Sequence, residues 1–148
     1  MDILRQAFRH VMDKRPFIMD AVVILPEHLH CIWTLPPDDA DFSTRWRLIK
    51  TWFSKHCDDK YKMKPNTSRL NKKEQALWQR RYWEHVIQDD LDFEHHVNYI
   101  HYNPVKHKYV NKPSDWKNSS IHQYIKLGII SDNWGMSDLY FPDTVGHE

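Results

Sequence analysis

The sequence predicts an α+β fold built as one domain over residues 1–148, and three observations lead to it. Two apolar, β-branched runs are separated by a two-residue connection, which predicts a pair of antiparallel strands. Apolar residues recur at helical spacing before this pair and again after it, which predicts flanking helices. A chain of 148 residues with 41% hydrophobic residues is large enough for one core.

The first helix is predicted over residues 3–13, where apolar residues fall on one face. These residues are Leu4, Phe8, Val11 and Met12. Asp2 is a candidate N-cap, because its carboxylate can accept a hydrogen bond from the first turn.

Two strands follow, over residues 17–25 and 28–35. They read FIMDAVVIL and HLHCIWTL, and the connection between them is Pro26–Glu27. Alternation along the second strand puts His28 and His30 side by side on one face with Ile32 and Thr34. The opposite face is expected to seal against helices, and it consists of Leu29, Cys31, Trp33 and Leu35.

A loop over residues 36–42 leads to a second helix, for which Asp41 or Ser43 is the predicted N-cap. The buried stripe of this helix is predicted to contain Phe42, Trp46, Ile49 and Phe53. Residues 57–75 are polar and basic, and we expect them to form a mobile loop.

The segment ALWQRRYWEHVI, residues 76–87, has the composition of a third strand. A third helix is predicted to begin after Asp89 or Asp90 and to end at about Asn103, because Pro104 disfavours helical geometry in the residue before it.

The end of the chain is predicted to contain a short helix around residues 119–127 and an irregular tail over residues 128–148.

Only three glycines are present, which excludes a P-loop, a dinucleotide fingerprint and a nucleophile elbow. Two cysteines are too few for a disulfide scaffold. No stretch approaches the ~18 apolar residues of a membrane span, so we expect a cytoplasmic protein with no membrane partner.

Positive charge is concentrated in residues 43–83, which carry twelve Lys or Arg against three acids in a chain of net charge +1. Aromatic residues interleave this segment, and the combination suits single-stranded nucleic acid. On charge alone, a solvated loop beside an ordinary aromatic core is the preferred interpretation. The candidate contacts to DNA phosphates are Arg45, Arg47, Lys50, Arg80 and Arg81.

A constellation of polar side chains suggests phosphodiester chemistry. On the third helix Tyr99 and Asn103 are one turn apart and can reach the same point. Two neutral imidazoles, His28 and His30, together with an amide oxygen could hold a divalent cation with positions open for a phosphate. A tyrosine phenolate can attack phosphorus and form a covalent ester. For an arbitrary protein, exposed or hydrogen-bonded histidines would be the favoured interpretation.

Four segments of the chain, taken together with their order and spacing, resemble one protein family. They are LPEHLHCIWTLP, FSTRWRLIK, WQRRYWEHVI and HVNYIHYNPVKHKYV. Together they resemble the REP-associated tyrosine transposases, relatives of the single-tyrosine HUH transposases, over roughly residues 4–135. The resemblance implies that His28, His30 and Asn103 bind Mg²⁺ or Mn²⁺. It also implies that Tyr99 is the catalytic nucleophile and forms a 5′-phosphotyrosine with a free 3′-hydroxyl.

The resemblance also implies a ferredoxin-like antiparallel sheet, with helices packed on one face and the active site on the other. Its implied substrates are single-stranded DNA hairpins of the REP-palindrome type, bound by a monomer or homodimer. Members usually have a strand before the first helix, and here that central N-terminal strand is expected to be missing. Lys108 stands where a glycine is commoner.

Two other functions remain open from the sequence. A hairpin-binding protein without turnover would fit the expected loss of a central strand. A metallohydrolase with a water nucleophile would need a general base, and the sequence offers no convincing one. Tyr99 is preferred as the nucleophile over three other tyrosines, Tyr82, Tyr102 and Tyr109. The remaining histidines of this region are expected to face solvent or form hydrogen bonds; they are His85, His95, His96, His101 and His107.

Overall fold

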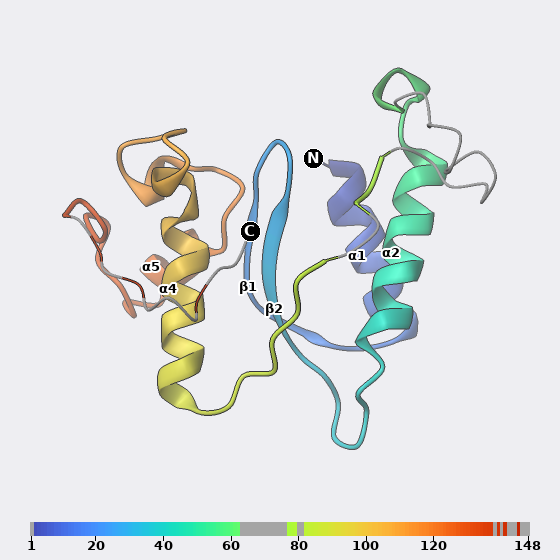
Figure 1. Cartoon of the computed structure of the whole chain (residues 1–148), viewed down its shortest axis with the longest axis horizontal. Helices are drawn as coiled ribbons and strands as arrows, with labels where there is room; N and C mark the ends of the chain where they lie inside the picture. The colour runs from blue at the N-terminus through green and yellow to red at the C-terminus, as the bar shows by residue number, and fades with distance from the viewer. Residues whose placement is uncertain are drawn as a thin grey trace. The chain divides into compact units, whose positions relative to one another are not determined.

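The computed structural model describes residues 2–62, 77–79, 82–137, 139, 141 and 145. Its elements confirm an α+β fold (Figure 1). They are α1 (Asp2–Lys14), β1 (Ile18–Ile24), β2 (Leu29–Thr34), α2 (Phe42–His56), the 3₁₀ turn η1 (Asp59–Tyr61), α4 (Asp90–Lys106), the 3₁₀ turn η2 (Pro113–Asp115) and α5 (Ile121–Lys126). None of the helices within these residues is long and apolar enough to cross a membrane.

The chain divides into two compact units. Unit 1 contains residues 1–17 and 35–82, and unit 2 contains residues 18–34 and 83–148. Unit 1 is built on the packing of α1 against α2, where Ala7 and Ile49 are fully buried. The predicted stripe of α2 is only partly buried apart from Ile49, because Arg45 shares the interior side of the helix.

Unit 2 is organised by the β1–β2 hairpin and by α4, which packs against it (Figure 1). The strands are antiparallel, with Val23 opposite His30. The core of the unit consists of Ala21, Val23, Leu25, Ile32, Val97 and Ile100. Ile32 lies on the same face of β2 as His30. The expectation that helices and the histidines occupy opposite faces is therefore wrong for α4, which packs on the face that bears His30.

The outer edge of β1 pairs with residues 118–120. The amide of Ile24 donates to the carbonyl of Asn118, and the amide of Ser120 donates to the carbonyl of Val22. The hydroxyl of Ser120 accepts a hydrogen bond from the Val22 amide and lies 2.9 Å from Nε2 of the buried His101. Burial lowers the pKa of His101 to about 4, and His122 adds a smaller effect. His101 is therefore neutral at physiological pH and connects α4 to this edge.

The predicted strand over residues 76–87 is not formed at its described residues, 77–79 and 82–87. Residues 82–88 have no regular secondary structure, while residues 76, 80 and 81 lie outside the described residues. A strand is stabilised by hydrogen bonds to a neighbouring strand, and in the described part of the chain the sheet consists of β1 and β2 alone. Aromatic and β-branched composition is therefore insufficient here. The predicted loop over residues 57–75 lies mostly outside the description, from residue 63 onward.

Helix α4 continues past Pro104 to Lys106, so the predicted end at Asn103 is wrong. Pro104 lacks an amide hydrogen, which removes one helical hydrogen bond, but its side chain is fully buried and the turn is closed further along. The amide of Lys108 donates to the carbonyl of Val105, and the amide of Tyr109 donates to that of Pro104. These two bonds form a Schellman motif, in which Lys108 adopts a left-handed φ of 60°.

Helix α5 ends with the same hydrogen-bond pattern, but there the left-handed residue is Gly128, with φ of 71°. A side chain in this conformation costs about 1–2 kcal/mol that glycine does not incur. We expect Lys108→Gly to raise the free energy of unfolding by about 1 kcal/mol in urea denaturation. Gly128→Ala should lower the free energy of unfolding, because alanine is strained in the left-handed conformation of this residue. An added Cβ meets no atom within 4 Å, so only this backbone strain acts. An unchanged or lower stability of Lys108→Gly would contradict this account.

Stability should also fall in mild acid because of His101. Its pKa in the folded chain, about 4, is below its ordinary value of about 6.5, so the unfolded chain takes up a proton first as pH falls. The contribution is complete above about pH 6.5 and is lost toward pH 4, amounting at most to about 3 kcal/mol. Urea unfolding of wild type and His101→Gln at about pH 7 and about pH 5 tests this. The variant should be less stable at neutral pH but less sensitive to acid; equal sensitivity would contradict the assignment.

Candidate functional site

The hairpin of unit 2 places two histidines at the start of β2. The carbonyl of His28 accepts a hydrogen bond from the amide of Leu25, which closes the tight connection between the strands. His30 is two residues further on, opposite Val23. The imidazole rings of His28 and His30 are in edge-to-face contact, with centroids 5.0 Å apart.

Helix α4 brings Tyr99 to this pair. Tyr99 is 5% exposed, and its ring centroid lies 5.6 Å from that of His30. His28, His30 and Tyr99 therefore form a continuous series of ring contacts between the hairpin and α4. Asn103 is on the next turn of the same helix and is fully buried. The competing Tyr102 instead contacts the rings of Trp134 and Phe141.

Two residues that sequence reasoning did not select also join this group. The ammonium of Lys106 donates a hydrogen bond to the Tyr99 hydroxyl over 2.6 Å, and the ring of His107 lies 5.0 Å from that of His28. Seven residues span almost two turns of an α-helix, so Lys106 lies on the same side as Tyr99. The spacing was visible in the sequence, but the expected helix end at Asn103 concealed it.

The arrangement combines metal-binding donors with a phenol and a cation. Two imidazoles and a buried amide oxygen are donors that fit a small divalent cation. An ammonium that donates a hydrogen bond to a phenol can stabilise negative charge on the phenolic oxygen, and Lys106 is placed to do so for Tyr99. The described part of unit 2 thus contains the groups that an attack on a phosphodiester requires.

Arg45, a predicted phosphate contact, is engaged inside unit 1. It is 2% exposed, forms a 2.7 Å ion pair with Asp39, and donates to the backbone carbonyls of Arg15, Pro16 and Asp41. This guanidinium lowers the pKa of Asp39 to about 2. A DNA phosphate could reach Arg45 only by displacing these bonds, which connect the end of α1 to the start of α2.

The other predicted contacts differ from Arg45. Arg47 is exposed on α2, and the ammonium of Lys50 lies 5.0 Å from the ring centre of Tyr82 and 5.8 Å from that of Trp78. Burial lowers the pKa of Lys50. Arg80 and Arg81 lie outside the described residues. Unit 1 therefore presents a cation beside two aromatic rings.

Comparison with known proteins identifies the family. A REP-associated tyrosine transposase of Escherichia coli K12 is 44% identical over 132 residues, which cover 89% of this chain and 71% of that protein. The chain belongs to the REP-associated tyrosine transposases. This confirms the resemblance found in the four sequence segments.

Two further comparisons agree with membership of this transposase family. A protein of Haemophilus influenzae named as a putative REP-associated tyrosine transposase is 39% identical over 131 residues, covering 88% of this chain and 74% of its own. A solved structure of a REP-associated tyrosine transposase bound to a REP hairpin has a TM-score of 0.73 and 42% identity. It covers 93% of this chain and 75% of its own. No family model matches the chain.

Proposed function

We propose that this chain cleaves and rejoins single-stranded DNA hairpins through a covalent bond to Tyr99. The contact of the Tyr99 ring with His30, at 5.6 Å, is the observation that carries the proposal, because it joins a nucleophile to a pair of metal-binding side chains. Membership of a tyrosine transposase family supports the same reaction class.

In the cleavage step the phenolic oxygen of Tyr99 attacks the phosphorus of the scissile phosphodiester. An Oη–P bond forms and the bond from phosphorus to the 3′-oxygen breaks. Tyr99 gives up its proton, and the 3′-oxygen takes one to leave as a hydroxyl. The products are a 5′-phosphotyrosine and a free 3′-hydroxyl. Attack by that hydroxyl on the phosphotyrosine reverses the step without ATP, since the ester keeps the energy of the original bond.

His28, His30 and Asn103 would hold the Mg²⁺ or Mn²⁺ of the reaction, and their donor types fit it. When bound, such an ion stabilises the negative charge that develops on the phosphoryl oxygens. Lys106 holds the Tyr99 oxygen through its 2.6 Å hydrogen bond and stabilises the phenolate before the attack. The edge-to-face contact with His30 fixes the ring of Tyr99.

The DNA hairpin would be bound through its phosphates and unpaired bases. Arg47 and Lys50 are the described candidates for phosphates, with Arg80 and Arg81 beyond the description, while the engaged Arg45 is a scaffold residue. Tyr82 and Trp78, beside Lys50, offer faces on which bases can stack. The solved relative bound to a REP hairpin supports a hairpin substrate.

We further propose that the sheet of the active protein is ferredoxin-like. The outer edge of β1 is covered by residues 118–120, whereas a further strand beside β2 would extend the sheet. Residues 82–88, whose composition favours a strand, could then pair with this further strand.

Replacement of Tyr99 by phenylalanine should abolish covalent adduct formation. The hydroxyl that attacks phosphorus is removed while the ring and its packing are kept. We expect a loss of about three orders of magnitude or more in adduct, measured with a labelled hairpin oligonucleotide and Mn²⁺ on a denaturing gel. Tyr102→Phe is the matched control on the same helix and should retain the adduct.

Binding of the hairpin separates this function from the alternatives. Tyr99→Phe should bind the hairpin as tightly as wild type. A wild-type protein that binds but never forms an adduct would support the hairpin-binding function instead. Cleaved ends free of protein would support hydrolysis by water. An adduct on Tyr99→Phe would refute the assignment of the nucleophile.

Loss of the Lys106 ammonium should slow the reaction without weakening DNA binding. We expect Lys106→Met to reduce the rate of adduct formation about 10- to 100-fold, because the phenolate loses a charge-assisted hydrogen bond. Lys106→Arg should restore part of the rate. Lys108→Met, at the same helix end, is the matched control and should react normally. Equal rates for wild type and Lys106→Met would contradict this role.

A further inference from the structure

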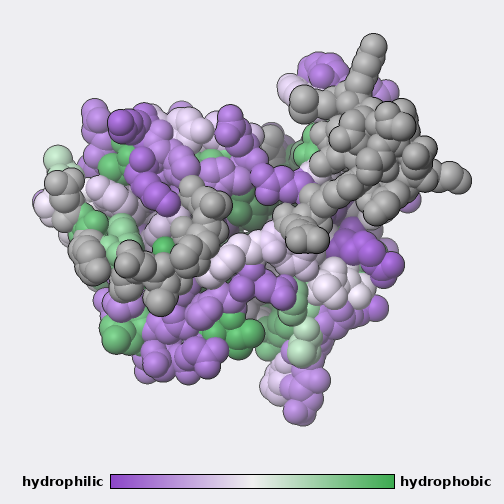
Figure 2. All heavy atoms as spheres, viewed as in Figure 1, coloured by the Kyte–Doolittle hydropathy of each residue, from purple (hydrophilic) through white to green (hydrophobic). Residues whose placement is uncertain are grey.

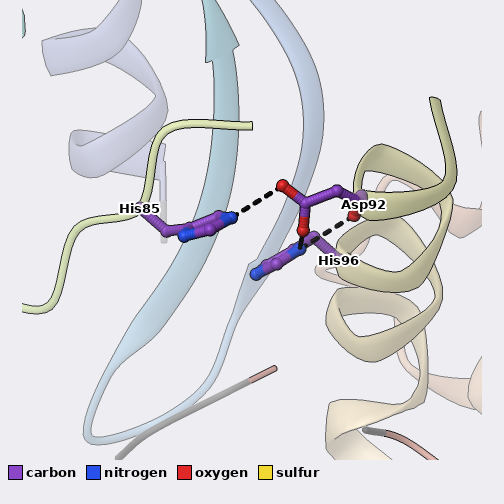
Figure 3. Close-up of side chains that lie close together, drawn as sticks. All are labelled: His85, Asp92 and His96. Carbon is purple, nitrogen blue, oxygen red and sulfur yellow. Dashed lines mark hydrogen bonds and ion pairs between the residues drawn. The ribbon is translucent and has the colours of Figure 1, made fainter. Parts of the chain in front are cut away.

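A second group of metal-binding side chains lies at the start of α4 (Figure 3). His85 comes from the segment before the helix, Asp92 from the first turn and His96 from the next turn. One potential ligand atom of each residue lies within 4.8 Å of the others. The three residues belong to unit 2 and include none of the residues proposed to hold the catalytic ion.

The centre of this group is the carboxylate of Asp92. One oxygen accepts hydrogen bonds from Nε2 of His85 over 2.7 Å and from the amide of Gln88 over 2.8 Å. The other lies 3.0 Å from Nδ1 of His96. The bond with His85, and then that with Gln88, lower the pKa of Asp92. Asp92 is therefore an anionic carboxylate between two imidazoles.

His96 has one ring nitrogen available for a ligand. It is 7% exposed, and its Nδ1 lies 2.8 Å from the backbone carbonyl of Asp92. A bond to a carbonyl requires the proton on Nδ1, which leaves Nε2 as an acceptor. Within the described residues this buried Nε2 has no hydrogen-bond partner. Buried polar atoms are normally satisfied, so the nitrogen is suited to an ion that the protein acquires.

We propose that His85, Asp92 and His96 form a binding site for a divalent transition-metal ion of the Zn²⁺ type. Two imidazoles and one carboxylate form a common donor set for zinc, and a fourth position stays open to water. His96 would ligate through Nε2 while its Nδ1–H keeps the bond to the Asp92 carbonyl, and the Asp92 carboxylate would turn from Nδ1 toward the ion. A ligating histidine is commonly oriented by such a bond.

Binding requires the three side chains to turn, because Nδ1 of His96 faces Asp92 and its Nε2 lies on the far side of the ring. The rings of His85 and His96 are stacked, 4.6 Å apart at 12°, and Trp83 is nearly parallel to both. The lone pair of an imidazole nitrogen lies in the ring plane, so the rings must tilt to reach one ion. His85 can do this because its side chain is 30% exposed. The ion then replaces the hydrogen bond between His85 and Asp92.

The site would have a structural role. The ion would connect the irregular segment 83–88 to the first two turns of α4, the helix that carries Tyr99 and Asn103. Its ligands are local to unit 2, so the proposal stands whether or not Tyr99 is the nucleophile.

Zinc titration of the whole chain tests the proposal. The background is His28→Ala/His30→Ala, which removes the other pair of histidines, after treatment with a chelator. We expect one equivalent of Zn²⁺ by calorimetry, a rise in Tm with Zn²⁺, and a visible Co²⁺ spectrum typical of tetrahedral coordination. Addition of His85→Gln or Asp92→Asn should weaken binding at least about tenfold and remove the rise in Tm.

His95→Gln is the matched control, since it changes a neighbouring histidine of α4 outside the group. It should bind Zn²⁺ as the background does. The partly exposed His85 keeps the test informative if a His96 variant fails to fold. Zinc binding that His85→Gln and Asp92→Asn leave intact would overturn the proposal. So would a background that binds no zinc, in which case the three residues form only a hydrogen-bonded contact.

Discussion

The packing of α4 against the β1–β2 hairpin is the interaction on which the candidate site depends. Val97 and Ile100 of the helix share a core with Val23 and Ile32 of the strands. Ile32 and His30 lie on one face of β2, and Tyr99 directly precedes the core residue Ile100 of α4. Burial of apolar surface therefore also sets the distance between the phenol and the imidazole. Most of the molecular surface that Figure 2 shows is hydrophilic, with apolar side chains in small separate patches.

The end of α4 has a second effect on the site. A proline in a helix usually removes one hydrogen bond and bends or ends the helix. Here the last turn is retained by the Schellman bonds to Val105 and Pro104, and Lys108 accepts a left-handed backbone to form them. The retained turn carries Lys106 to the hydroxyl of Tyr99 and His107 to the ring of His28. A strained position thus supports two residues that complete the group.

Local patterns in the sequence were sufficient for the hairpin and for most of each helix. Alternation along the second strand placed His28 and His30 on one face of that strand. Helical spacing placed Tyr99 and Asn103 on one side of α4. Lys106 was missed because the rule for residues before proline is local, whereas tertiary packing decides whether the helix continues. Residues 82–88 were misassigned because a strand needs a partner that composition cannot supply. Arg45 looks like other basic residues of α2, and only its contacts with Asp39 and three carbonyls distinguish it.

The central claim is that the phenol beside the histidine pair becomes bonded to DNA. The most direct measurement is tandem mass spectrometry of the protein after reaction with a hairpin oligonucleotide and Mn²⁺, followed by nuclease and protease digestion. The account predicts a nucleotide attached through its 5′-phosphate to Tyr99. Attachment to another tyrosine of the chain, such as Tyr82 or Tyr109, would contradict it.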